Sequence, residues 1–185
     1  MKTKTIPVTL LALALCLLSS TAAQPPKPTA QLQAMAKLDW LVGDWKGDGW
    51  IEFAPGEKRT FTQTENVQRQ AGGTVITIEG HGTTAYGGTN TPIHDAFAVI
   101  SFDPMSRKYR WRSHTEKGYA SDLVPTIGER TFQWALDVPN MGTMRYTIVL
   151  NEKSEWFEIG EMSRDGKEWS KFFEMTLRKS PAAKP

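Results

Sequence analysis

Ionisable side chains alternate along several segments that have the pattern of β-strands, a spacing that would gather them on one face of a sheet. Glu79 and His81 alternate in one segment, and Arg112 and His114 alternate in another. If these faces point into a cavity, each isolated charge needs a partner or a charged ligand. We therefore expect Arg112 or Arg145 to hold a carboxylate head group.

Aromatic side chains on neighbouring segments would line an apolar channel beside those charges. The full set of predicted ligand-binding residues is Glu79, His81, Arg112, His114, Trp134, Arg145, Tyr146, Phe157, Glu161 and Glu174. The alternative is that the charged members are solvated positions on the outer face. A shift of one residue in register exchanges the two faces, so the sequence leaves both interpretations open.

Motifs for covalent or phosphate chemistry do not occur in the sequence. It contains no G-x-S-x-G, no P-loop and no G-x-G-x-x-G that opens a helix. The histidines His81, His94 and His114 lack metal-ligand spacing, so no catalytic residue and no metal site are predicted. A binding protein is favoured over an enzyme. The enzyme alternative is an isomerase or hydrolase with His114 or Glu161 as base.

The N-terminus has the pattern of a secretory signal peptide. Lys2 and Lys4 precede the apolar run 6–18, and small residues lead to a cleavage site after Ala23. Residues 1–23 are therefore predicted to be removed, and the protein to be periplasmic or secreted. The run is too short to span a membrane.

Removal of this peptide changes the charge and the cysteine content. Cys16, the only cysteine, is lost, and Lys plus Arg falls from 22 to 20 against 20 Asp plus Glu. The predicted mature chain is neutral and has no basic stripe, which argues against nucleic acid as a partner. Its expected partner is a small apolar molecule, and its oligomeric state is left open.

The remaining chain has the length of one domain. Residues 24–29 are expected to be a disordered leader, 30–179 a β-barrel domain, and 180–185 a loose tail. A helix is predicted over 30–38, with Leu32, Met35 and Leu38 at helical spacing. About ten strands follow, separated by short Gly, Pro, Asn and Asp turns. Their predicted ranges are 45–53, 58–68, 74–83, 95–102, 108–115, 119–123, 131–137, 143–150, 155–163 and 169–178.

Sequential hairpins of this kind predict an all-β, antiparallel up-and-down sheet. A closed β-barrel would remove its two long edges, and ten strands leave room for a ligand. A two-sheet sandwich is the alternative, and a barrel filled by its own side chains would be a structural module. The segment Leu38–Trp50, with three tryptophans, is expected to plug one end of the barrel.

A family resemblance supports this interpretation. Gly43-x-Trp45 at the start of the first strand, after a short helix, with Arg178 near the end of the last, resembles the lipocalin and fatty-acid-binding (calycin) superfamily. The phrases LVGDWKGDG, SFDPMSRKYRWRS and SRDGKEWSKFFEMTLRK are similar to bacterial lipocalin-like barrels related to nitrobindin-type haem-binding proteins.

The resemblance implies that Gly43, Trp45 and Arg178 are structural, with the tryptophan packed against the late basic side chain. It also implies an exported carrier of a small, largely apolar ligand. Nitrobindin-type barrels bind haem through a histidine on a late strand, and no histidine follows His114 here. No cofactor is therefore expected, and haem is kept as an alternative.

Overall fold

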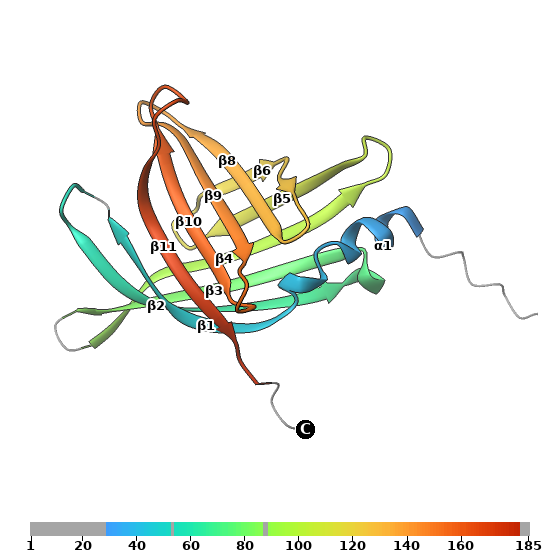
Figure 1. The fold of residues 1–185 in the computed structure, drawn as a ribbon, viewed down its shortest axis with the longest axis horizontal. Helices are drawn as coiled ribbons and strands as arrows, with labels where there is room; N and C mark the ends of the chain where they lie inside the picture. The colour runs from blue at the N-terminus through green and yellow to red at the C-terminus, as the bar shows by residue number, and fades with distance from the viewer. Residues whose placement is uncertain (1–28, 53, 87–88, 182–185) are drawn as a thin grey trace, which may run out of the picture.

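The computed structural model describes residues 29–181 except 53, 87 and 88. Within this part, the chain forms one strongly curled antiparallel sheet with a short helix at one end (Figure 1). The predicted signal peptide, residues 24–28 of the predicted leader and residues 182–185 of the predicted tail lie outside the described residues. Thr29, the last residue of that leader, begins the helix.

The elements follow the predicted order. The helical elements are α1 (Thr29–Ala36), η1 (Asp39–Leu41) and η2 (Ala71–Gly73). The strands are β1 (Gly43–Glu52), β2 (Lys58–Gln70), β3 (Val75–Tyr86), β4 (Thr89–Asp103), β5 (Lys108–Thr115), β6 (Ala120–Leu123), β7 (Thr126–Ile127), β8 (Thr131–Val138), β9 (Gly142–Leu150), β10 (Trp156–Ser163) and β11 (Ser170–Lys179). The two-residue strand β7 was not predicted, because two residues are too few for an alternating pattern.

Each strand pairs with its neighbours in the chain, and β1 also pairs with β11. The sheet order is β6-β5-β4-β3-β2-β1-β11-β10-β9-β8-β7, so β6 and β7 are its edges. No ladder joins these edges within the described residues, and the predicted closed barrel is therefore confirmed only as a barrel-like, curled all-β sheet. The chain passes between the edges through Val124 and Pro125, and a proline has no N–H to donate to a ladder.

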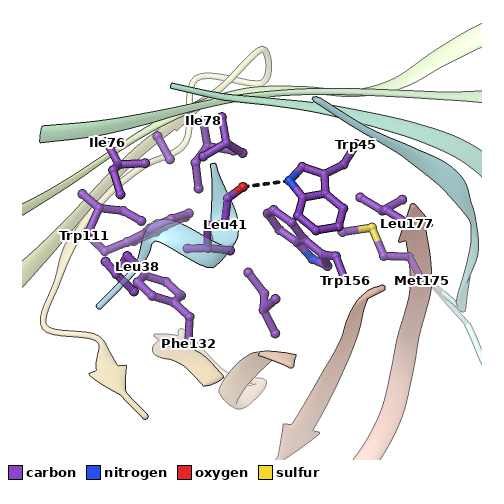
Figure 2. Close-up of a cluster of buried hydrophobic side chains, with 14 of the residues drawn as sticks. Leu38, Leu41, Trp45, Ile76, Ile78, Trp111, Phe132, Trp156, Met175 and Leu177 are labelled. Carbon is purple, nitrogen blue, oxygen red and sulfur yellow. Dashed lines mark hydrogen bonds between the residues drawn. The ribbon is translucent and has the colours of Figure 1, made fainter. Parts of the chain in front are cut away.

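The main hydrophobic cluster surrounds the N-terminal helical segment. Met35 of α1, Leu38 between the two helices and Leu41 of η1 are fully buried. Figure 2 shows Leu38 and Leu41 among side chains of the sheet. The hydroxyl of Tyr109 on β5 donates to the carbonyl of Ala34 at 2.8 Å, which ties the helix to the sheet. The helical segment thus fills one end of the curled sheet.

Trp45 anchors the start of β1 in this cluster. Its Nε1 donates to the carbonyl of Leu41 at 2.7 Å, shown as the dashed line in Figure 2, and its ring meets Trp156 edge to face at 5.7 Å. The basic group over the ring is Lys179, whose Nζ lies 5.0 Å from the ring centroid.

Arg178 was the predicted basic partner of Trp45, and the structure corrects this by one residue, to Lys179. Trp45 is paired in register with Lys179, so these two side chains share the inner face, and Arg178 points outward. There the Nε of Arg178 lies 2.8 Å from a carboxylate oxygen of Glu155. Gly43, the other predicted structural residue, has a φ of +134° that a side chain would strain.

The helices within the described residues are too short or too polar to cross a membrane.

Candidate functional site

A cavity of about 610 Å³ lies inside the curl of the sheet, next to the hydrophobic cluster. Its wall is formed by residues of β1–β6 and β8–β11, and the pairs Glu65–Gly80 and Glu158–Met175 are opposite each other on adjacent strands. Cavities of this volume commonly hold one small molecule.

Aromatic rings form a continuous part of the cavity wall. Trp111 on β5 stacks on Trp134 on β8 at 4.7 Å, and Trp134 stacks on Tyr146 on β9 at 5.2 Å. Tyr146 in turn meets Phe173 on β11 edge to face at 5.9 Å. The contact between Trp111 and Trp134 joins strands on opposite sides of the unpaired sheet edges, so side chains bridge the place where the backbone ladder stops.

Glu65 on β2 contributes a buried carboxyl group to this aromatic cavity. The side chain is 7% exposed, and its Oε1 accepts a hydrogen bond of 2.7 Å from the Nε2 of Gln63. Burial raises the pKa of Glu65 to about 7, against the lowering effect of that hydrogen bond. Gly80 lies opposite on β3, and a Cβ there would approach both carboxyl oxygens to 2.7 and 2.8 Å. The glycine therefore makes the space that the carboxyl group occupies.

Glu158 on β10 is the second buried carboxyl group. It is 5% exposed, and its Oε2 accepts a hydrogen bond of 2.9 Å from the Nε1 of Trp156. Burial raises the pKa of Glu158 to about 8; the hydrogen bond opposes this shift, and the nearby charge of Glu65 adds to it. The charge of Glu65 is thus close enough to Glu158 to affect its ionisation, and both residues line the same cavity. Burial and the charge of Glu158 also raise the pKa of Tyr146.

No arginine or lysine belongs to the described cavity lining. Neither Glu65 nor Glu158 has a basic partner within the described residues. Two polar atoms of β5, Trp111 Nε1 and Thr115 Oγ1, are buried without a hydrogen-bond partner. The cavity wall therefore presents two carboxyl groups without a basic partner among the described residues.

The mouth of the cavity lies at the end away from α1. Its lining there includes Tyr119, Asp137 and Pro139, and Tyr119 is 72% exposed. His94 also lines this exposed part. A ligand could enter here without displacing the helical segment.

The structure brings two of the ten predicted ligand-binding residues to the cavity. Trp134 and Tyr146 line it. The other eight lie outside the lining, so the expectation that they face inward is corrected; they are Glu79, His81, Arg112, His114, Arg145, Phe157, Glu161 and Glu174.

Strand alternation explains why Arg112 and His114 point outward. Trp111, Ser113 and Thr115 take the inner positions of β5, which leaves Arg112 and His114 on the outer face. Arg112 lies 3.2 Å from a carboxylate oxygen of Asp122 on β6, so its charge is already paired. Neither arginine proposed to hold an acidic head group is available to the cavity.

Arg145 is likewise paired on the outside. Its Nη2 lies 2.8 Å from Glu161, and its guanidinium group lies 3.8 Å from the ring centroid of Trp169. Arg145 and Tyr146 are adjacent on β9, so they could not both face inward. Phe157 and Glu161 lie on the outer face of β10, whereas Trp156 and Glu158 of the same strand face inward.

Two of the remaining outward residues also have surface partners. His81 lies 3.3 Å from Asp95, and Glu174 lies 2.6 Å from Lys171. Glu79 is exposed on the same face of β3 as His81.

Sequence reasoning missed the buried carboxyl groups. Glu65 shares its alternation with Phe61 and Val67, which would have placed it on the inner face of β2. The spacing of Gly80 and Gly82 in β3 is a second signal, because glycines opposite Glu65 and Gln63 make room for their side chains. Glu158 was missed because the apolar residues Phe157 and Ile159 make the outer face of β10 look more hydrophobic. That face was therefore predicted to point to the interior.

The cavity does not offer the haem site that the resemblance implies. Haem would need an iron ligand on the late strands and cations or water for its propionates. The late strands present no histidine to the cavity, and the only described histidine in the lining is His94, near the mouth. The buried floor instead presents two carboxyl groups. Elsewhere in the described part of the chain, no group of three His, Cys, Asp or Glu side chains could hold a metal ion.

No family model and no curated protein matches this sequence. Among solved structures, the crystal structure of Rv2717c from M. tuberculosis is similar, with a TM-score of 0.59 and 13% sequence identity over 82% of this chain and 98% of that chain. At this identity the similarity shows the fold alone, and it agrees with a barrel-like antiparallel sheet.

Proposed function

We propose that this protein binds and carries a small, largely apolar ligand in the cavity of its curled sheet. The observation that carries the proposal is the cavity of about 610 Å³ with its wall of stacked aromatic rings. Aromatic side chains give a large apolar contact area, and they favour flat or ring-containing ligands. The cavity argues against a module filled by its own side chains.

The proposal includes two features that the sequence predicts. The protein is exported, because its N-terminus has the pattern of a signal peptide. The sheet acts as a closed container, because stacking of Trp111 on Trp134 covers the place where the edges do not pair. A lipocalin-like carrier has both features.

Binding of a neutral apolar probe tests the proposal. N-phenyl-1-naphthylamine should bind to the purified protein with enhanced probe fluorescence and quench its tryptophans. In the variant Ala96→Phe, a ring would occupy the cavity, since Ala96 belongs to its lining. We expect this variant to bind the probe at least about tenfold more weakly, a loss of about 1.4 kcal/mol.

Val99→Phe is the matched control, because it adds bulk to the same strand at a position outside the lining. Its affinity for the probe should equal that of the wild type. Failure of the wild type to bind the probe, or equal loss in both variants, would contradict the carrier function.

An acid–base enzyme is the second candidate, and one observation favours it. Glu65 and Glu158, with pKa values of about 7 and 8, are poised to exchange protons near neutral pH. The bases predicted from the sequence, His114 and Glu161, lie outside the cavity. Mass spectrometry of ligands incubated with the protein separates the candidates: a carrier returns its ligand unchanged, and an enzyme converts it in a reaction that Glu65→Gln slows.

A further inference from the structure

The wall of the cavity selects the charge of the ligand that it can hold. An acidic ligand would bring a carboxylate next to Glu65 and Glu158, with no arginine or lysine in the described lining to balance it. Like charges at close range in a region of low dielectric repel strongly. The acidic head group expected from the sequence is therefore the least suitable one.

The free oxygens of the two carboxyl groups favour a positively charged ligand. Oε1 of Glu65 and Oε2 of Glu158 each accept one hydrogen bond, and within the described residues their other carboxyl oxygens accept none. A buried carboxylate without a cation is costly, and a cation supplied by the ligand would remove that cost. Aromatic faces also attract cations, and Trp134, Tyr146 and Trp156 belong to the same lining.

We infer that the ligand is an arylalkylamine, with a protonated amino group held by Glu65 and Glu158. Its ring stacks among the aromatic side chains of the cavity wall. This inference rests on the proposed carrier function and gives its ligand a chemical class.

Three probes that differ only in the head group test the charge. They are tyramine (an amine), tyrosol (the matching alcohol) and 3-(4-hydroxyphenyl)propanoate (an acid), each titrated calorimetrically into the full protein at pH 8.5. We expect tyramine to bind at least about tenfold more tightly than tyrosol and the acid to bind most weakly. The pH dependence has a defined sign: the carboxyl groups must be ionised to hold the amine, so tyramine should bind at least about tenfold more weakly at pH 5.5, whereas tyrosol changes little.

Variants assign these effects to residues. Glu65→Gln and Glu158→Gln keep the shape of the side chain, and each should remove most of the preference for tyramine over tyrosol. Glu161→Gln and Glu174→Gln, on the outer face, should leave it unchanged. The other titratable groups of the lining are His94, Tyr119, Asp137 and Tyr146. Of these, His94 is the group whose pKa burial lowers, and the pH dependence should persist in His94→Gln.

The outcomes separate the two proposals. Binding of tyrosol or the acid at least as tight as that of tyramine, or a preference for the amine that survives in both glutamine variants, would overturn the ligand class and leave the carrier function standing. If no probe binds, including the neutral naphthylamine, the carrier function itself is wrong.

Discussion

At the scale of single residues, the unusual feature of this protein is a pair of buried carboxyl groups with no basic partner among the described residues. Glu65 and Glu158 each receive one hydrogen bond from a neighbour two positions away on the same strand, Gln63 and Trp156. One hydrogen bond does not replace the hydration that a carboxylate loses on burial. The folded protein therefore holds both groups in the neutral form to higher pH than water does.

This pair predicts how stability depends on pH. The pKa values in the folded protein are about 7 for Glu65 and about 8 for Glu158, above the usual value of 4.5 that applies to the unfolded chain. Between these values the unfolded chain releases protons that the folded protein keeps. The free energy of unfolding should therefore fall as pH rises from about 4.5 to 8, by up to about 1.4 kcal/mol per pH unit for each group.

Urea unfolding at pH 5, 6, 7 and 8 measures this slope. The double variant Glu65→Gln/Glu158→Gln should be much less sensitive to pH and more stable than the wild type at pH 8. Glu161→Gln, whose carboxylate is paired with Arg145 on the outer face, should keep the wild-type slope. A wild-type curve that is flat or rises with pH would contradict the burial of the pair as neutral acids.

At the scale of elements, glycines decide how closely the strands and their side chains approach. In β1, a Cβ at Gly47 would lie 2.0 Å from the carbonyl oxygen of Thr176 on β11. In β3, Gly80 leaves space for the carboxyl group of Glu65. Both glycines lie on the inner face of the sheet, and Gly80 belongs to the cavity lining.

Gly47→Ala should therefore destabilise the protein, because the added methyl group meets backbone rather than a flexible side chain. We expect a loss of about 1–3 kcal/mol or more in the free energy of unfolding, measured by urea denaturation. Gly128→Ala is the control: its φ is not in the left-handed region, and its nearest contact is the Cβ of Thr131 at 3.3 Å. It should change stability by much less, and equal losses in the two variants would show that the contact with β11 is not the cause.

At the scale of the whole molecule, the two ends of the curled sheet have different roles. The N-terminal helical segment fills one end with Met35, Leu38 and Leu41, which are fully buried. The other end opens to the cavity through the exposed residues around Tyr119 and Pro139. Stability is therefore concentrated at the end of α1 and binding at the end with the mouth.

Leu38→Ala tests this division. Leu38 has no exposed surface, so its truncation should cost about 2–5 kcal/mol of unfolding free energy in urea denaturation. Met105→Ala, at a side chain that is 94% exposed, should cost less than about 0.5 kcal/mol. Leu38 is absent from the described cavity lining, so the affinity for the neutral probe should stay within about twofold as long as Leu38→Ala is folded. A small loss of stability would contradict the role of the helical segment as a plug.

The sequence by itself determined the elements of this protein and their order. The alternating pattern and the turn residues placed β5 at Lys108–Thr115, as the structure has it, and most other strands within a few residues. These features are local, because strand periodicity and turn chemistry depend on residues close together in the chain. The predicted helix followed from the same kind of pattern, whereas the packing of Trp45 against a late basic side chain was implied by the family resemblance.

Only the tertiary structure decided which face of each strand looks inward and whether the sheet closes. Arg145 and Tyr146, or Glu158 and Phe157, are neighbours in the chain and lie on opposite sides of the wall, so a shift of one residue changes the chemistry of the cavity completely. Pairing between strands sets that register, and it joins residues as distant as Trp45 and Lys179. Long-range pairing leaves no signal in a local pattern, which is why the sequence predicted a container and the fold revealed the acids inside it.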